Sequence, residues 1–161
     1  SLLPLLNAAP LRRITLHPRI GKQQYKGEAD REAFAAFYSE CTHPLAYNGD
    51  LQTVDDIRMV EEAFPRLEGV MLGRGLLVNP ALAWEYAEGT VLSSADLTDR
   101  VKVFHARLFR HYESCLQGDA QLLGKMKSYW EYLLPHADRK IKKAIKKATT
   151  IDKYLDAVSL L

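Results

Sequence analysis

The sequence has little cysteine and no long uninterrupted apolar run. Its two cysteines, Cys41 and Cys115, stand far apart, so they form neither a disulfide framework nor a metal-binding spacing. Asp, Glu, Lys or Arg interrupts every apolar stretch well short of the roughly 20 residues that cross a bilayer. The first residues also lack the basic flank and cleavage site of a signal peptide. We therefore expect reduced thiols, a cytoplasmic location, no metal site and no membrane partner.

Internal repeats and low-complexity tracts are absent as well, and the charges are divided unevenly. Residues 1–99 carry 9 Lys and Arg against 14 Asp and Glu, whereas residues 100–161 carry 13 against 6. This asymmetry indicates two regions with different roles, the second of which faces a polyanion. A solvated lysine-rich surface is the plainer alternative.

Short apolar runs alternate with helical patterns in residues 1–92. Asp30 and Thr53 stand where N-caps are expected, each ahead of a helical pattern. The apolar runs that predict strands are residues 11–16, 44–47 and 69–72. The alternation predicts about three βα units with parallel strands, which is part of an α/β barrel.

From residue 93 onward the pattern is helical throughout, so we place a domain boundary at about residue 92. A first helix of some five turns is expected to end at Gly118. The further helices are expected over residues 120–134, 139–148 and from 150 to the end. Residues 93–161 are therefore predicted to form an all-α domain.

Three polar or glycine-containing loops follow the predicted strands, at the ends where α/β folds carry their chemistry. They are His17-Pro18-Arg19, Asn48-Gly49-Asp50 and Gly73-Arg74-Gly75. A glycine loop that leads into a helix forms an anion site, and Arg74 can add a charge-assisted contact to a phosphate. Each loop taken alone is also typical of an ordinary turn, so their ordered set is the informative feature.

In order and spacing, these stretches resemble the distal barrel of the tRNA-dihydrouridine synthases. The matching segments are residues 14–19, 24–27, 47–50, 69–75 and 79–80, with a looser similarity at residues 125–130. The resemblance implies a TIM barrel followed by a helical tRNA-binding domain. It also implies a reaction in which NADPH reduces bound FMN. The reduced flavin then passes a hydride to the 5,6 double bond of a uridine flipped out of tRNA, and a cysteine acid protonates the other carbon.

The same resemblance assigns roles to residues of the three loops. It places His17 against the isoalloxazine ring and the loop from Asn48 through Gly49 to Asp50 at the ribityl phosphate. Gly73 and Arg74 are assigned to the other side of that phosphate. Arg19 lies in the matching loop and is expected to face substrate RNA. Without the resemblance, a capping or core role is the better interpretation of His17.

Several departures from the family pattern limit these expectations. The first five barrel strands have no counterpart here, and the cysteine acid belongs to that part, so we expect no catalytic residue in this chain. His17-Pro18 also replaces the commoner His-Gly of the loop. We therefore expect a fragment that is inactive by itself, binds FMN weakly, and self-associates through the open edge of its sheet.

One predicted helix concentrates basic residues and is the expected RNA contact. Its six basic side chains are Arg139, Lys140, Lys142, Lys143, Lys146 and Lys147. We assign RNA binding to Arg139, Lys140, Lys143 and Lys147. Tyr129 is a candidate for stacking on a base, whereas a core position is the better prediction for Trp130.

Two other classes of protein are compatible with the sequence. One is a different FMN-dependent TIM-barrel oxidoreductase that acts on a small molecule, such as a dihydroorotate-type dehydrogenase. It shares the phosphate loops but has no need of a basic helical domain. The other is a non-catalytic RNA-binding module.

Overall fold

The computed structural model describes residues 2–161, and all counts and absences below refer to this range. The chain forms two compact units, the first ending at Gly75 and the second comprising Leu76–Leu161. The boundary predicted at residue 92 falls inside the second unit. The assignment of residues 76–92 to a barrel thus stays a prediction that the compact units do not reproduce.

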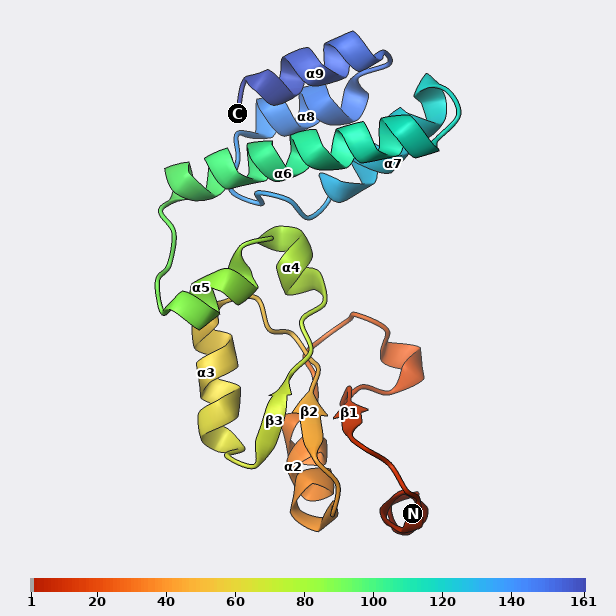
Figure 1. Cartoon of the computed structure of the whole chain (residues 1–161), viewed down its shortest axis with the longest axis vertical. Coiled ribbons are helices and arrows are strands. Elements are labelled where there is room, and N and C mark those ends of the chain that lie inside the picture. The colour runs from red at the N-terminus through yellow and green to blue at the C-terminus, as the bar shows by residue number, and fades with distance from the viewer. Residues whose placement is uncertain (1) are drawn as a thin grey trace. The chain divides into compact units, whose positions relative to one another are not determined.

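The first unit contains a three-stranded parallel sheet in the order β1-β2-β3, with helices beside it (Figure 1). The strands are β1 (Ile14–Leu16), β2 (Leu45–Tyr47) and β3 (Leu67–Val70). The helices are α1 (Leu3–Ala8), the short 3-10 helix η1 (Gly21–Gln23), α2 (Arg31–Glu40) and α3 (Val54–Ala63). The predicted parallel βα units are therefore confirmed.

Local sequence signals explain the starts of α2 and α3. The Asp30 side chain accepts a hydrogen bond from the amide of Ala33 at 2.9 Å, which caps α2. Thr53 and Asp56 form a reciprocal capping box at the start of α3. Both predicted caps are confirmed. The sequence did not predict α1, η1 or the five-residue helix α4 (Arg74–Val78).

The core of the first unit lies around β2, whose three residues are all buried. The Phe34 ring meets Tyr47 and Phe64 edge to face, with ring centroids 4.8 and 4.9 Å apart. Burial of β2 on both faces accounts for its entirely apolar sequence. Its neighbours β1 and β3 form the two edges of the sheet.

The second unit is helical (Figure 1). Its helices are α5 (Leu82–Glu88), α6 (Ser94–Cys115), α7 (Asp119–Tyr129), α8 (Arg139–Lys147) and α9 (Ile151–Ser159). Asp138 and Thr150 cap α8 and α9 as predicted. The helix predicted to reach Leu134 ends at Tyr129 instead, and Leu134 adopts a φ of +45° ahead of Pro135. A residue before proline is disfavoured in the helical region, so the chain turns before it.

A hydrogen-bonded trio of side chains lies inside the hydrophobic core of this unit. The Trp130 indole N–H donates to the Tyr154 hydroxyl oxygen at 2.8 Å. The Tyr154 hydroxyl lies 2.7 Å from His105 Nε2. Because an indole only donates, the hydroxyl must donate onward, so His105 Nε2 accepts and the imidazole is neutral. The burial of Trp130 at 0% exposure confirms its predicted core position.

Candidate functional site

All six residues predicted to bind the cofactor line one cavity of about 230 Å³ in the first unit. They are His17, Asn48, Gly49, Asp50, Gly73 and Arg74, and Tyr25, Leu51 and Met71 complete the lining. Because the strands are parallel, the loops that follow their carboxyl ends come together at one edge of the sheet. The structure therefore assembles a site from positions as much as 57 residues apart in the sequence.

The carboxylate of Asp50 connects three segments around this cavity. Its Oδ1 accepts a hydrogen bond from Arg74 at 2.7 Å. Its Oδ2 accepts from the Ala29 amide at 2.8 Å and from the Arg19 guanidinium. Asp50 has a φ of +49°, a conformation that Asp and Asn adopt more readily than most residues. The local backbone and the three donors together fix the direction of this carboxylate.

These donors also set the charge state of Asp50. Burial raises the pKa of the carboxyl, but the Ala29 amide, Arg19 and Arg74 together hold that pKa below its ordinary value. Asp50 is thus an anion that orients two arginines. A direct contact to a phosphate would bring two negative charges together, so Asp50 acts on a bound anion through Arg74.

Arg19 occupies a different position from the one expected for an RNA contact. Its side chain is 2% exposed, and its guanidinium donates to Asp50 and to the carbonyls of Lys26 and Gly27 at 3.0 and 2.8 Å. Arg19 therefore fastens the segment around η1 to the loop after β2. This geometry gives no support to a contact between Arg19 and RNA.

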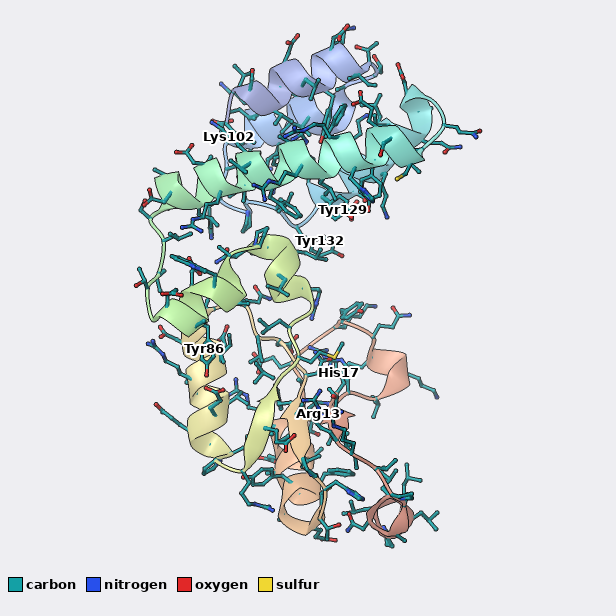
Figure 2. All side chains as sticks on the ribbon, viewed as in Figure 1. Arg13, His17, Tyr86, Lys102, Tyr129 and Tyr132 are labelled. Carbon is teal, nitrogen blue, oxygen red and sulfur yellow. The ribbon has the colours of Figure 1, made fainter. Side chains whose placement is uncertain are left out.

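His17 and Asn48 tie the loops together at the edge of the sheet (Figure 2). The His17 Nδ1 lies 2.7 Å from the Asn48 carbonyl oxygen. A carbonyl only accepts, so Nδ1 carries the proton and Nε2 is left as the second functional atom of the ring. The Asn48 side-chain amide donates to the Met71 carbonyl at 2.7 Å. The loops after β1, β2 and β3 are thereby held in one arrangement.

The two glycines in this cavity have different physical reasons. A Cβ on Gly49 would lie 2.8 Å from the Ala29 Cβ and 2.9 Å from the Tyr47 hydroxyl, so packing demands glycine there. A Cβ on Gly73 would meet no heavy atom within 4 Å. The open space beside Gly73 is the part of the cavity edge where a ligand has room to approach the backbone.

Arg74 is the cation of this cavity that solvent reaches. Its side chain is 30% exposed, and its guanidinium carbon lies 4.3 Å from the centroid of the Tyr25 ring. Contacts with the Asp50 carboxylate and the Tyr25 ring hold the guanidinium in place from two directions. A preorganised, half-exposed arginine of this kind can bind an anion without losing side-chain freedom.

A second candidate surface is the basic groove along α8. It is lined by Pro135, Ala137, Arg139, Lys140, Lys142, Lys143, Lys146 and Lys147. The four residues predicted to bind RNA all belong to it, and all four are exposed. Among the described residues, no acidic side chain lines the groove. The groove therefore presents a concentrated positive charge to solvent.

Two lysines near the groove serve the fold instead. Lys142 donates to the carbonyls of Leu133 and Leu134 at 3.0 and 3.3 Å, which satisfies the irregular turn after α7. Burial and the neighbouring charge of Lys146 lower the pKa of Lys142. Lys127 donates to the Ala148 carbonyl at the end of α8. Sequence alone does not separate these lysines from those that face solvent.

The remaining candidates lie outside both surfaces. Tyr129 is half-buried and shares a 2.9 Å hydrogen bond with the Tyr112 hydroxyl, so it supports the helix pair α6 and α7. Cys41 is buried in the first unit, and Cys115 is exposed on α6. Within residues 2–161, no three His, Cys, Asp or Glu side chains gather where they could hold a metal ion. No described helix is both long enough and apolar enough to span a bilayer.

A parallel βα sheet with an anion-type cavity at the carboxyl ends of its strands, followed by a helical region, defines an α/β protein of the barrel class. The dihydrouridine synthase family model matches residues 3–159, and the chain belongs to this family. It is also 32% identical over 103 residues to a protein of Rhizobium leguminosarum bv. phaseoli named "Probable tRNA-dihydrouridine synthase". That match covers 63% of this chain and 31% of the relative, so the chain spans about a third of that protein.

Proposed function

We propose that this chain contributes the phosphate-binding side of an FMN site and an RNA-binding helical region to a tRNA-dihydrouridine synthase that uses NADPH. The observation that carries the proposal is the convergence of all six predicted cofactor residues on one cavity. When bound, FMN supplies hydride transfer to a uridine base. The cavity is smaller than most sites for whole cofactors, which fits the phosphate end of FMN alone.

Three groups around the cavity suit a phosphate and its attached chain. The half-exposed guanidinium of Arg74 supplies positive charge, and the space beside Gly73 admits the ligand to the backbone. The neutral His17 ring, oriented through its Nδ1, offers Nε2 to a neighbouring polar group. Asp50 and Tyr25 hold Arg74 in position.

Comparing FMN with riboflavin, which lacks the phosphate, tests this site. We expect the unmodified chain to bind FMN more tightly than riboflavin, because only FMN pairs with Arg74. Replacing Arg74→Gln should weaken FMN binding about tenfold, the effect of losing one charged hydrogen bond, and should leave riboflavin binding unchanged. Flavin fluorescence quenching measures both affinities.

The matched control is Arg58→Gln, which removes an arginine from the exposed face of α3. It should alter neither affinity. Equal binding of FMN and riboflavin by the unmodified chain would contradict the assignment of the cavity to the phosphate.

The basic groove is proposed to track the phosphate backbone of tRNA. The double charge reversal Lys143→Glu and Lys147→Glu should weaken tRNA binding by at least tenfold. It should also lower the slope of log affinity against log salt by about 2. Filter binding at several salt concentrations measures both quantities. Lys153→Glu, an exposed lysine on α9 outside the groove, is the control, and an equal loss with Lys153→Glu would contradict a specific role for the groove.

The edge strand β1 is proposed to mediate self-association of the isolated chain. A cavity of about 370 Å³ beside β1 is lined by the apolar residues Leu16, Pro18, Ile20, Ala33 and Phe37, among others. Ile20 is largely exposed. Sedimentation velocity should show association that increases with concentration and that Ile20→Glu reduces. A monomer at all concentrations would oppose this proposal.

A non-catalytic RNA-binding protein is the second candidate function. The observation in its favour is that neither described cysteine lines the flavin-type cavity. Retained tRNA binding together with no detectable FMN binding would favour this candidate. A small-molecule oxidoreductase is disfavoured by the family match and by the basic groove.

A further inference from the structure

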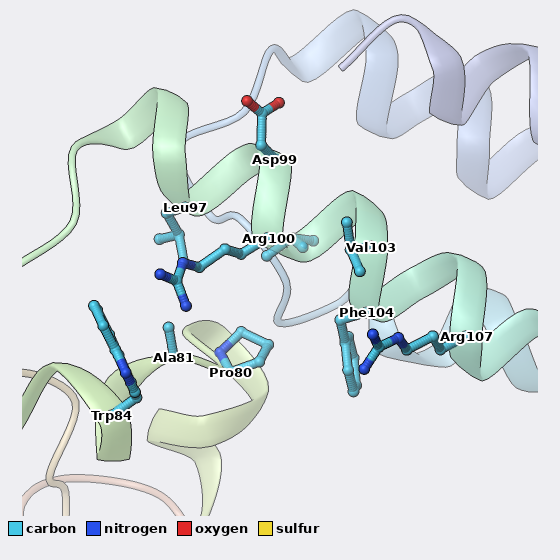
Figure 3. Close-up of a pocket in the computed structure, with 10 residues that line it drawn as sticks. Pro80, Ala81, Trp84, Leu97, Asp99, Arg100, Val103, Phe104 and Arg107 are labelled. Carbon is cyan, nitrogen blue, oxygen red and sulfur yellow. The ribbon is translucent and has the colours of Figure 1, made fainter. Parts of the chain in front are cut away.

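A second, mainly apolar cavity lies within the helical unit and is not part of either surface described above. It has a volume of about 500 Å³ and lies between the start of α5 and the first half of α6 (Figure 3). Its walls include Pro80, Ala81, Trp84, Arg100, Phe104 and Arg107. The volume falls within the range of sites that bind small organic molecules.

Two large aromatic rings of this cavity remain accessible to solvent. Trp84 is 39% exposed and Phe104 is 36% exposed. The same unit buries its other large aromatic side chains, Trp130 and Tyr154, completely. Exposed aromatic rings that flank a cavity are a feature of binding surfaces more than of the rest of a protein surface.

The charges around the cavity favour an anionic ligand. The guanidinium carbon of Arg100 lies 4.2 Å from the centroid of the Trp84 ring, and Arg107 lines the cavity beside Phe104. Both guanidinium groups extend toward the gap, whereas the carboxylate of Asp99 points away from it (Figure 3). An apolar side chain of a protein partner would gain nothing from two arginines at this position.

We propose that this cavity binds one unpaired nucleotide of an RNA, with its base against the aromatic rings and its phosphate at the arginines. A base has two apolar faces that stack on aromatic rings whatever its identity, and its phosphate pairs with guanidinium groups. Unpaired nucleotides are the parts of an RNA that offer such faces. The inference rests on the proposed RNA substrate and adds a specific stacking site to it.

Fluorescence anisotropy of a labelled hexauridylate, titrated with the whole chain, tests the site. Phe104→Leu keeps the apolar surface but removes the ring, and it should weaken binding about tenfold. Arg107→Gln should weaken binding to a similar extent. Arg110→Gln removes the same charge from the same helix outside the cavity, so it should have a clearly smaller effect.

Tryptophan fluorescence provides a second readout at the site itself. The chain has two tryptophans, and the buried Trp130 is shielded from ligands. Hexauridylate should therefore quench Trp84, and Trp84→Phe should abolish the quenching. Thermal unfolding of each variant verifies that it is folded.

The outcomes separate this proposal from the proposed function. If the Phe104 and Arg107 variants bind hexauridylate like the parent while Lys143→Glu with Lys147→Glu weakens binding, the stacking site is wrong and the RNA function stands. A change in sedimentation without a change in RNA affinity would assign the cavity to a protein partner instead. If the parent chain binds neither hexauridylate nor tRNA, the proposed function fails and this inference fails with it.

Discussion

Replacing Asp50→Asn should destabilise the first unit by about 2 to 3 kcal/mol, because it leaves the buried Arg19 guanidinium without its counter-charge. The Arg19 side chain is 2% exposed, so water cannot replace the lost carboxylate. Asparagine keeps the size of the side chain and tolerates the positive φ of residue 50. The substitution therefore isolates the charge. Urea unfolding followed by circular dichroism measures the change.

A double-mutant cycle identifies the cause of this loss. Arg19→Met in the Asp50→Asn background should recover part of the stability, because an apolar side chain has no need of a counter-charge. Asp55→Asn serves as the control, since the Asp55 side chain is 86% exposed and its nearest arginine nitrogen is 4.0 Å away. Asp50→Asn and Asp55→Asn variants of equal stability would contradict the role of Asp50 as a buried hub.

The low pKa of Asp50 has a defined consequence for acid stability. A carboxyl whose folded pKa lies below its unfolded value of 3.8 contributes stability above that pH. The contribution is lost as the pH falls through the folded pKa. The Asp50→Asn variant should therefore differ most from the parent near neutral pH and least in strong acid.

The helical unit should lose stability at a higher pH, between about 6.5 and 4, because of His105. Burial lowers the pKa of His105 to about 4 from an ordinary value of 6.5. In this window the unfolded chain takes up a proton that the folded chain excludes, so unfolding becomes more favourable as the pH falls. The full effect amounts to about 3 kcal/mol at the lower end of the window.

The hydrogen bonds around His105 explain why the folded state excludes this proton. Tyr154 donates to His105 Nε2 because it already accepts from Trp130. Protonation of Nε2 would place two donors against each other in the core. Burial also raises the pKa of Tyr154 to about 12, so the hydroxyl keeps its proton throughout this pH range.

Urea unfolding at a series of pH values, followed by Trp130 fluorescence in a Trp84→Phe background, measures this dependence. His105→Gln keeps an acceptor for the Tyr154 hydroxyl but does not titrate, so the pH dependence between 6.5 and 4 should flatten. His111→Gln removes an exposed histidine from the same helix and should leave the dependence intact. The same slope in the parent and in His105→Gln would refute the account.

The sequence by itself determined the features that depend on near neighbours along the chain. The caps at Asp30, Thr53 and Asp138 each act on amides two or three residues away. The three strands and the order of the loops were predicted for the same reason, because hydrophobic patterns and turn residues act locally. The resemblance in those loops also led to the family that the family model then established.

The tertiary structure alone decided how the charged groups pair. The Asp50 partners Arg19 and Arg74 are 31 and 24 residues away along the chain, so no local pattern shows that one carboxylate orients both. The division of the lysines into Lys142, which satisfies buried carbonyls, and Lys143, which faces solvent, is likewise invisible in a run of basic residues. Such pairings depend on distances and burial that exist only once the strands and helices have packed, which is why the sequence predicted where the site lies but not which side chains are free to bind.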